Sequence, residues 1–186
     1  NVIKILPGGV VTAKDTAEIQ LDENGEFVRN PEEDIVKVAV VERHQGTGNV
    51  ACGFLKGYGI KAGAVALSIA HDSHNIIVVG VSDEEMEFAV NSLIAQEGGM
   101  VLVREGKVLE SMPMPIAGLM SDQSGEWVDE KLTAIHAKAY EELGIAGDVE
   151  PVMTLCFMSL AVIPEVKLTD MGLFDVTTFS FIPVEA

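Results

Sequence analysis

The most polar short segment in the middle of the chain is His71, Asp72, Ser73, His74 and Asn75. It lies between two apolar, strand-like runs, residues 63–70 and 76–79. Burying such side chains without hydrogen bonds would cost about 1–3 kcal/mol each, so the segment must reach water, a partner or a ligand. Because imidazole and carboxylate groups donate and accept near neutral pH, the segment could form the wall of a site. A polar turn whose side chains satisfy one another is the alternative.

Two specific chemistries can be tested on this segment. A Ser-His-Asp triad brings three groups face to face, normally from separate elements, whereas adjacent side chains at 71–74 diverge. A metal ion on His71 and His74 would need further ligands, for which Glu42 and His44 are the candidates at the end of an earlier strand. We therefore disfavour the triad and expect no metal ion within this chain.

A second candidate is the glycine-rich stretch from Glu42 to Asn49, which includes Arg43 and His44. It follows an apparent strand, and residues 50–58 could be a short helix, so the order resembles a phosphate-binding site in outline. The stretch lacks both the Walker spacing and the full Gly-x-Gly-x-x-Gly pattern. A turn is therefore favoured over a nucleotide cradle.

The elements that would position these residues are mostly strands. Alternating or β-branched runs predict strands at 2–6, 35–41, 63–70 and 76–79, a hairpin around Asn24 and Gly25, and a second hairpin at 100–111. Ser82 and Glu85 have the spacing of a capping box and predict a helix that ends at Gly98, and apolar periodicity predicts another helix at about 126–142. Residues 152–163 are too uniformly apolar to classify, and a last strand is expected near 176–182.

These elements predict an α/β protein of mixed α+β type, with a mixed sheet of about six strands, including hairpins, flanked by a few helices. We expect residues 1–186 to form a single domain. The two cysteines, Cys52 and Cys156, sit among apolar neighbours and are expected to be buried thiols.

The net charge of −17, from 29 acidic and 12 basic residues, opposes binding to nucleic acid or to anionic membranes. No apolar stretch approaches the roughly 18 residues of a membrane span, and the first residues lack signal-peptide features. These observations predict a cytoplasmic protein with no nucleic-acid or membrane partner.

Five blocks carry a resemblance to the C-terminal region of bacterial adenine deaminases. They are VERHQGTGN (41–49), GFLKGYG (53–59), SIAHDSHNIIVVG (68–80), PMPIAGLMSD (113–122) and KLTDMGL (167–173). In that family a metal-bound hydroxide attacks C6 of adenine, which gives hypoxanthine and ammonia. The resemblance implies Mn or Fe ions held by a barrel domain whose ligands begin with a His-x-His pair. This chain has no His-x-His, so the barrel and its metal are expected outside it and the isolated chain is expected to be inactive.

The resemblance also implies partners: the protein's own barrel domain, adenine as substrate and further copies of the subunit. A positive mean hydropathy, +0.29 despite the charge, suggests an apolar face that such a barrel would cover. The residues expected to line or support the pocket are His71, Asp72, Ser73, His74, Asn75, Arg43 and His44. The alternatives are a purely structural or oligomerising domain with no substrate contact, and a free-standing metalloenzyme or ligand-binding module.

Overall fold

The computed structural model describes residues 1–185, which are organised around a mixed eight-stranded sheet. From edge to edge its strands are β10 (Lys107–Pro113), β9 (Gly99–Arg104), β7 (Ala64–Leu67), β8 (Ile76–Gly80), β5 (Ile35–Val41), β6 (Val50–Lys56), β1 (Val2–Ile5) and β2 (Thr12–Asp15). Neighbouring strands are antiparallel except β1 and β6, which are parallel. The predicted mixed α+β class is confirmed, and the sheet is larger than the expected six or so strands.

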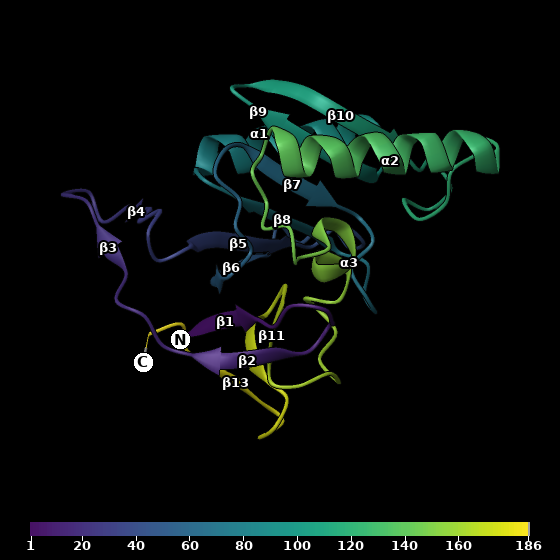
Figure 1. Ribbon diagram of the computed structural model, residues 1–186. Helices are drawn as coiled ribbons and strands as arrows, with labels where there is room; N and C mark the ends of the chain where they lie inside the picture. Colours follow the sequence, from purple (N-terminus) through teal and green to yellow (C-terminus); the bar gives the residue numbers. More distant parts are fainter. Residues whose placement is uncertain (186) are drawn as a thin grey trace.

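Helices cover both faces of this sheet. Helix α1 (Asp83–Ala95) packs on β7, β8 and β9, whereas α2 (Gly125–Glu141) packs on β10 and α3 (Pro151–Cys156) on β7 and β8. Figure 1 shows α2 and α3 in front of the sheet and α1 behind it. The predicted cap of α1 is confirmed, since the Ser82 hydroxyl accepts a hydrogen bond from the Glu85 amide at 3.3 Å. None of the helices within residues 1–185 is both long and apolar enough to cross a bilayer.

Strand β5 shows how the two faces divide the core. Val36, Val38 and Val40 belong to the larger apolar cluster, which includes α2 and α3 residues. Ala39, between them in the sequence, belongs to the smaller cluster beneath α1. Successive side chains of a strand point to opposite faces, so a continuous β-branched run is what a strand buried on both sides requires.

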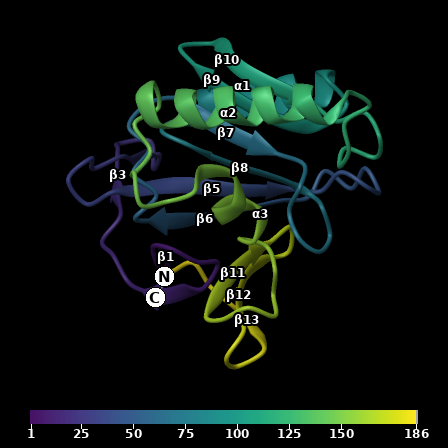
Figure 2. The same ribbon diagram turned by 45° about the vertical axis from the view of Figure 1, so that its right-hand side comes forward.

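A three-stranded sheet of β11 (Val166–Thr169), β12 (Gly172–Asp175) and β13 (Ser180–Ile182) lies beneath β6, as Figure 2 shows, and β3 (Gln20–Leu21) pairs with β4 (Phe27–Val28). The small sheet packs closely against β6 at Gly53, where an added Cβ would lie 3.0 Å from the Leu173 Cδ1 atom. The chain ends meet beside it, where the Asn1 amino group donates to the Val184 carbonyl oxygen at 2.6 Å.

The predicted helix at residues 50–58 is wrong, because this segment is β6. It pairs with β5 over seven residues, from Val41 opposite Val50 to Ile35 opposite Lys56. The glycine-rich stretch is therefore a hairpin turn, closed by the Glu42 amide on the Asn49 carbonyl oxygen at 2.9 Å. A short apolar run does not distinguish helix from strand by its period, and here the long-range pairing decides. The strand–loop–helix outline of a phosphate site disappears with the helix.

Two further expectations change, and the unclassified run receives an assignment. Cys52 is exposed on β6, because α1 does not extend over that strand, whereas Cys156 is buried as predicted, and both are free thiols. The unclassified run begins with α3. The last predicted strand is shorter, since the Asp175 carboxylate accepts from the Thr177 and Thr178 amides and holds a turn before β13.

Lys167 on β11 is fully buried, opposite Phe174 on β12. Its ammonium group donates to the carbonyl oxygen of Val10 at 2.8 Å. Burial lowers the pKa of Lys167 from 10.5 to about 8, because the charged form loses its hydration. The protonated side chain therefore costs the folded state stability at neutral pH.

This burial predicts a pH-dependent stability. Between about pH 8 and pH 10.5 the unfolded chain binds more protons at Lys167 than the folded chain, so the free energy of unfolding should rise with pH over this range. The Lys167→Met substitution should remove this contribution, which is on the order of 3 kcal/mol. Urea unfolding of both proteins at several pH values checks it, and identical pH slopes would contradict the prediction.

Candidate functional site

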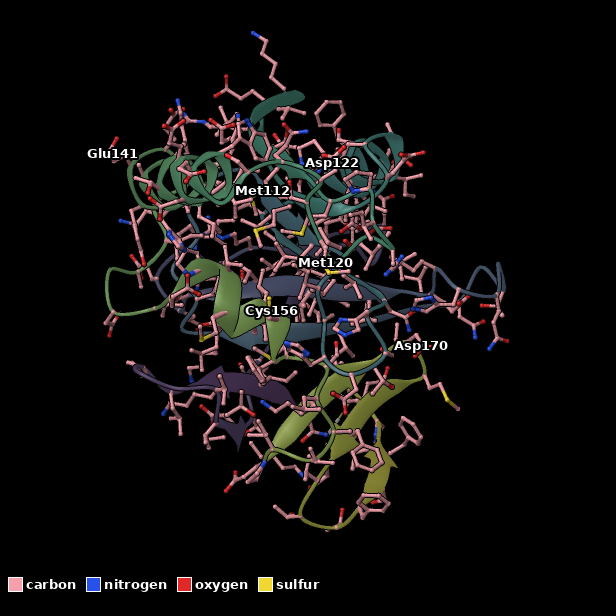
Figure 3. The ribbon with its side chains drawn as sticks, turned by 90° about the vertical axis from the view of Figure 1, so that its right-hand side faces the viewer. Met112, Met120, Asp122, Glu141, Cys156 and Asp170 are labelled. Atoms are coloured by element: carbon pink, nitrogen blue, oxygen red, sulfur yellow. The ribbon has the colours of Figure 1, made fainter. Side chains whose placement is uncertain are left out.

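The predicted polar segment connects β7 to β8 at one end of the large sheet, where two other loops meet it. These are the β5–β6 turn and the loop that follows β10. Figure 3 labels Met120 and Asp122 on the loop that follows β10. The structure therefore brings together all seven predicted site residues, His71 to Asn75 with Arg43 and His44.

Arg43 joins the three loops. Its Nε donates to the His74 carbonyl oxygen at 2.5 Å, and its Nη2 donates to the Ala117 carbonyl oxygen at 2.9 Å. The Arg43 amide donates to the buried Asn75 Oδ1 at 3.2 Å. A planar guanidinium directs several donors in fixed directions, which suits it to two carbonyls on different loops. Arg43 and Asn75 are therefore occupied in holding the loops in place.

Glu42 organises the β5–β6 turn. Its carboxylate accepts from the amides of His44, Gln45 and Thr47 at 2.5, 2.7 and 3.0 Å, and from the Thr47 hydroxyl at 2.9 Å. These donors stabilise the ionised form and lower the pKa of Glu42 from 4.5 to about 2. The turn is thus ordered although residues 44–50 are exposed.

His44 completes the link between the loops. Its Nε2 lies 2.6 Å from the Ser73 carbonyl oxygen, so the ring donates there when Nε2 carries a proton. The backbone of residues 73–74 is consequently held by two side chains of the neighbouring turn, His44 and Arg43.

The side chains left for a ligand are those of His71, Asp72, Ser73 and His74. The His71 ring lies against Phe157, with 4.7 Å between centroids, and 5.1 Å from the His74 ring. Asp72 and Ser73 are exposed. The buried Nδ1 of His74 makes no hydrogen bond among residues 1–185.

The His74 ring is held neutral. Burial first, and then the nearby His71 and Arg43, lower the pKa of His74 below its ordinary value of 6.5. At neutral pH it can therefore donate from one nitrogen and accept at the other. With the Asp72 carboxylate beside it, this edge can offer donors and acceptors to an uncharged polar ligand.

A metal site does not fit these residues. Within residues 1–185, no three His, Cys, Asp or Glu side chains are grouped so that they could hold an ion. The Nε2 of His44 faces a carbonyl oxygen, and Glu42 is engaged by its own turn. The two further ligands considered, Glu42 and His44, therefore have other partners.

Sequence reasoning missed the supporting residues Ser68 and Gly118. The buried Ser68 hydroxyl donates to the Gly118 carbonyl oxygen at 2.5 Å and accepts from the Gly99 amide at 2.7 Å. Gly118 has φ +73°, and a Cβ there would lie 3.0 Å from Nη1 of Arg43. A glycine soon after two prolines indicates a turn, but no local signal indicates that arginine packs on it.

The two hydrogen bonds from the Arg43 guanidinium to carbonyl oxygens predict the effect of a charge-conserving substitution. The His74 amide donates to Ala70 and the Met120 amide to Ile116, within the two loops that Arg43 holds. Arg43→Lys should give both amides faster hydrogen exchange, because one ammonium cannot reach both carbonyls in the same directions. Arg29→Lys is the matched control, since Arg29 also donates to two carbonyl oxygens, of Ile60 and Lys61. Unchanged exchange at His74 in Arg43→Lys would contradict the assigned role.

The Glu42 turn predicts a second effect. Because its folded pKa lies below the ordinary value, the order contributed by the carboxylate is present above about pH 4.5 and is lost as the pH falls towards about 2. Glu42→Gln should give the Thr47 amide faster exchange at neutral pH and no such acid transition. Hydrogen exchange at several pH values measures both, and equal protection in the two proteins would refute the idea.

Known proteins resemble this chain along its whole length. The family model described as the adenine deaminase C-terminal domain matches residues 9–180. Adenine deaminase 2 of Desulfotalea psychrophila is 69% identical over 186 residues, the whole of this chain and 32% of that protein. The adenine deaminase of Ligilactobacillus salivarius is 49% identical over 185 residues, again 32% of its length.

The chain thus spans about a third of the length of these relatives. The β5–β6 turn, the β7–β8 loop and the loop after β10 all lie within the matched residues. The chain belongs to the adenine deaminase C-terminal domain family.

Proposed function

We propose that this chain is the C-terminal part of an adenine deaminase, which hydrolyses adenine to hypoxanthine and ammonia. The family match over residues 9–180 carries this proposal. Since the relatives extend over about three times the length of this chain, the rest of such an enzyme would supply the barrel domain and its Mn or Fe ions. The metal would activate the attacking water. The isolated chain would be inactive.

For the chain's own residues, we propose that the β7–β8 loop faces the adenine pocket. Adenine is uncharged and presents both hydrogen-bond donors and acceptors, which suits a neutral histidine beside a carboxylate. His71, Asp72 and His74 would contact or border the base. Arg43, His44 and Asn75 would position the loop, as their contacts with residues 73–75 and 117 indicate.

A purely structural or oligomerising role is the second candidate. The exposed aromatic side chains of the small sheet, Phe179 and Phe181 at 74% and 50% exposure, favour an interface somewhere on the domain. In that case the β7–β8 loop would have no substrate contact, and the hydrogen bonds of Arg43 would serve only to hold the loops at this end of the sheet.

Kinetics of the full-length enzyme separate the two candidates. Asp72→Ala and His74→Ala should each lower turnover of adenine at least about tenfold, roughly 1.4 kcal/mol, by removing groups that border the base. Asp129→Ala, an exposed aspartate on α2, is the matched control and should leave turnover unchanged.

Wild-type kinetics in both loop variants would overturn the pocket role. A change in subunit assembly by size measurement, with normal kinetics, would instead support the oligomerising role. If His74 borders the base in its neutral form, wild-type activity should persist at pH values below 6.5 before protonation of this ring removes it.

A further inference from the structure

A groove runs along α1 on the face of the sheet that this helix only half covers. Helix α1 lies over β7, β8 and β9, and beyond it Val50 and Cys52 on β6 are exposed. The hollow between the helix and β6 has a volume of about 320 Å³. Its lining is mostly apolar, with Ala39, Val41, Val50, Cys52, Val78 and Val90 among its residues.

The groove continues into the candidate site. A second hollow shares Val41 with the first and is lined by Glu42, Arg43 and Ile94. Val50 and Ile94 are 54% and 57% exposed, so both hollows present apolar side chains to solvent. An element lying in the groove would therefore end next to the turn that holds the β7–β8 loop.

The rim of the groove is acidic. Two carboxylates of α1, Asp83 and Glu87, line it, and α1 contains no basic residue. Glu85 does not face the groove, because its carboxylate accepts from the Glu105 amide at 2.6 Å. Lys37, on the opposite side, is already paired with Asp83 at 2.7 Å. Glu97 adds a further carboxylate beside the second hollow.

The charge around the groove favours a basic partner over a second copy of this chain. A second copy of this chain carries the same net charge of −17, so two acidic rims would repel each other. A helix with an apolar stripe between basic flanks would bury the exposed valines and pair with the rim. The small side chains of Ala39 and Cys52 on the floor allow the close approach that helix packing needs.

We propose that the groove receives an amphipathic helix with basic flanks from the part of the enzyme that lies outside this chain. The inference rests on the proposed function, because it requires that the chain be one part of a longer adenine deaminase. It goes beyond that function by assigning the docking face. The docked helix would complete the helical layer begun by α1 and bring the candidate site edge against the rest of the enzyme.

Cys52 makes the groove testable in the full-length enzyme. The exposed thiol should be shielded by the docked helix. It should react with N-ethylmaleimide at least about tenfold more slowly than a cysteine introduced at Lys107, the exposed first residue of β10. The buried Cys156 is the internal reference for a shielded thiol. Peptide mass spectrometry reads each site separately.

The thiol pKa must be separated from shielding, because burial raises the pKa of Cys52 even without a partner. Each site is therefore also labelled with a bulky maleimide, and the ratio of bulky to small reagent is compared, which cancels the ionised fraction of each thiol. The paired substitution Glu87→Lys with Val90→Lys, which places positive charge in the groove, should raise the Cys52 ratio. Glu130→Lys on α2 should not.

A Cys52 ratio equal to that of Lys107→Cys in the wild-type background would overturn the proposal, whether or not the paired variant folds. Protection that disappears on dilution would also overturn it, because it would identify a second subunit as the occupant. An accessible Cys52 together with slow turnover in Asp72→Ala would reject this docking face and leave the proposed function standing. A shielded Cys52 with unchanged kinetics in Asp72→Ala would support this docking face and reject only the pocket role of the β7–β8 loop.

Discussion

The Arg43 guanidinium is the constraint on which the polar edge of this domain depends. It donates to carbonyl oxygens of two different loops and lies on the end of a third, so β5, the β7–β8 loop and the loop after β10 are held as one unit. Charge-assisted bonds to carbonyls are among the stronger polar interactions in proteins. The side chains of His71, Asp72 and His74 are thereby presented on a backbone held by hydrogen bonds from the neighbouring turn.

The large sheet makes this arrangement possible. Because β5 and β8 are central and buried on both faces, their ends are fixed in position relative to each other. The two residues that leave β5, Glu42 and Arg43, have separate tasks: the first orders its own turn and the second reaches across to other loops. The rigid strands therefore fix where the loops begin, and the hydrogen bonds of Glu42 and Arg43 fix the backbone of the loops themselves.

Electrostatics distinguishes the inside of the domain from its rim. Inside, the buried Lys167 ammonium destabilises the folded state, whereas at the polar edge partial burial lowers the pKa of His74. Outside, Glu87 of α1 and the Asp83–Lys37 ion pair border an apolar groove. An acidic rim around uncovered apolar surface suits a basic, amphipathic partner and disfavours self-association through the same face.

Local pattern in the sequence was sufficient for the mixed α+β class, for α1 with its Ser82 cap, for strand β5 and for the segment 71–75 as the polar loop between two buried strands. These depend on interactions within a few residues or on simple alternation. Tertiary structure alone decided that residues 50–56 pair as β6, that Cys52 is exposed and that Arg43 packs on Gly118. Each of these depends on partners many residues away, which short-range periodicity does not encode.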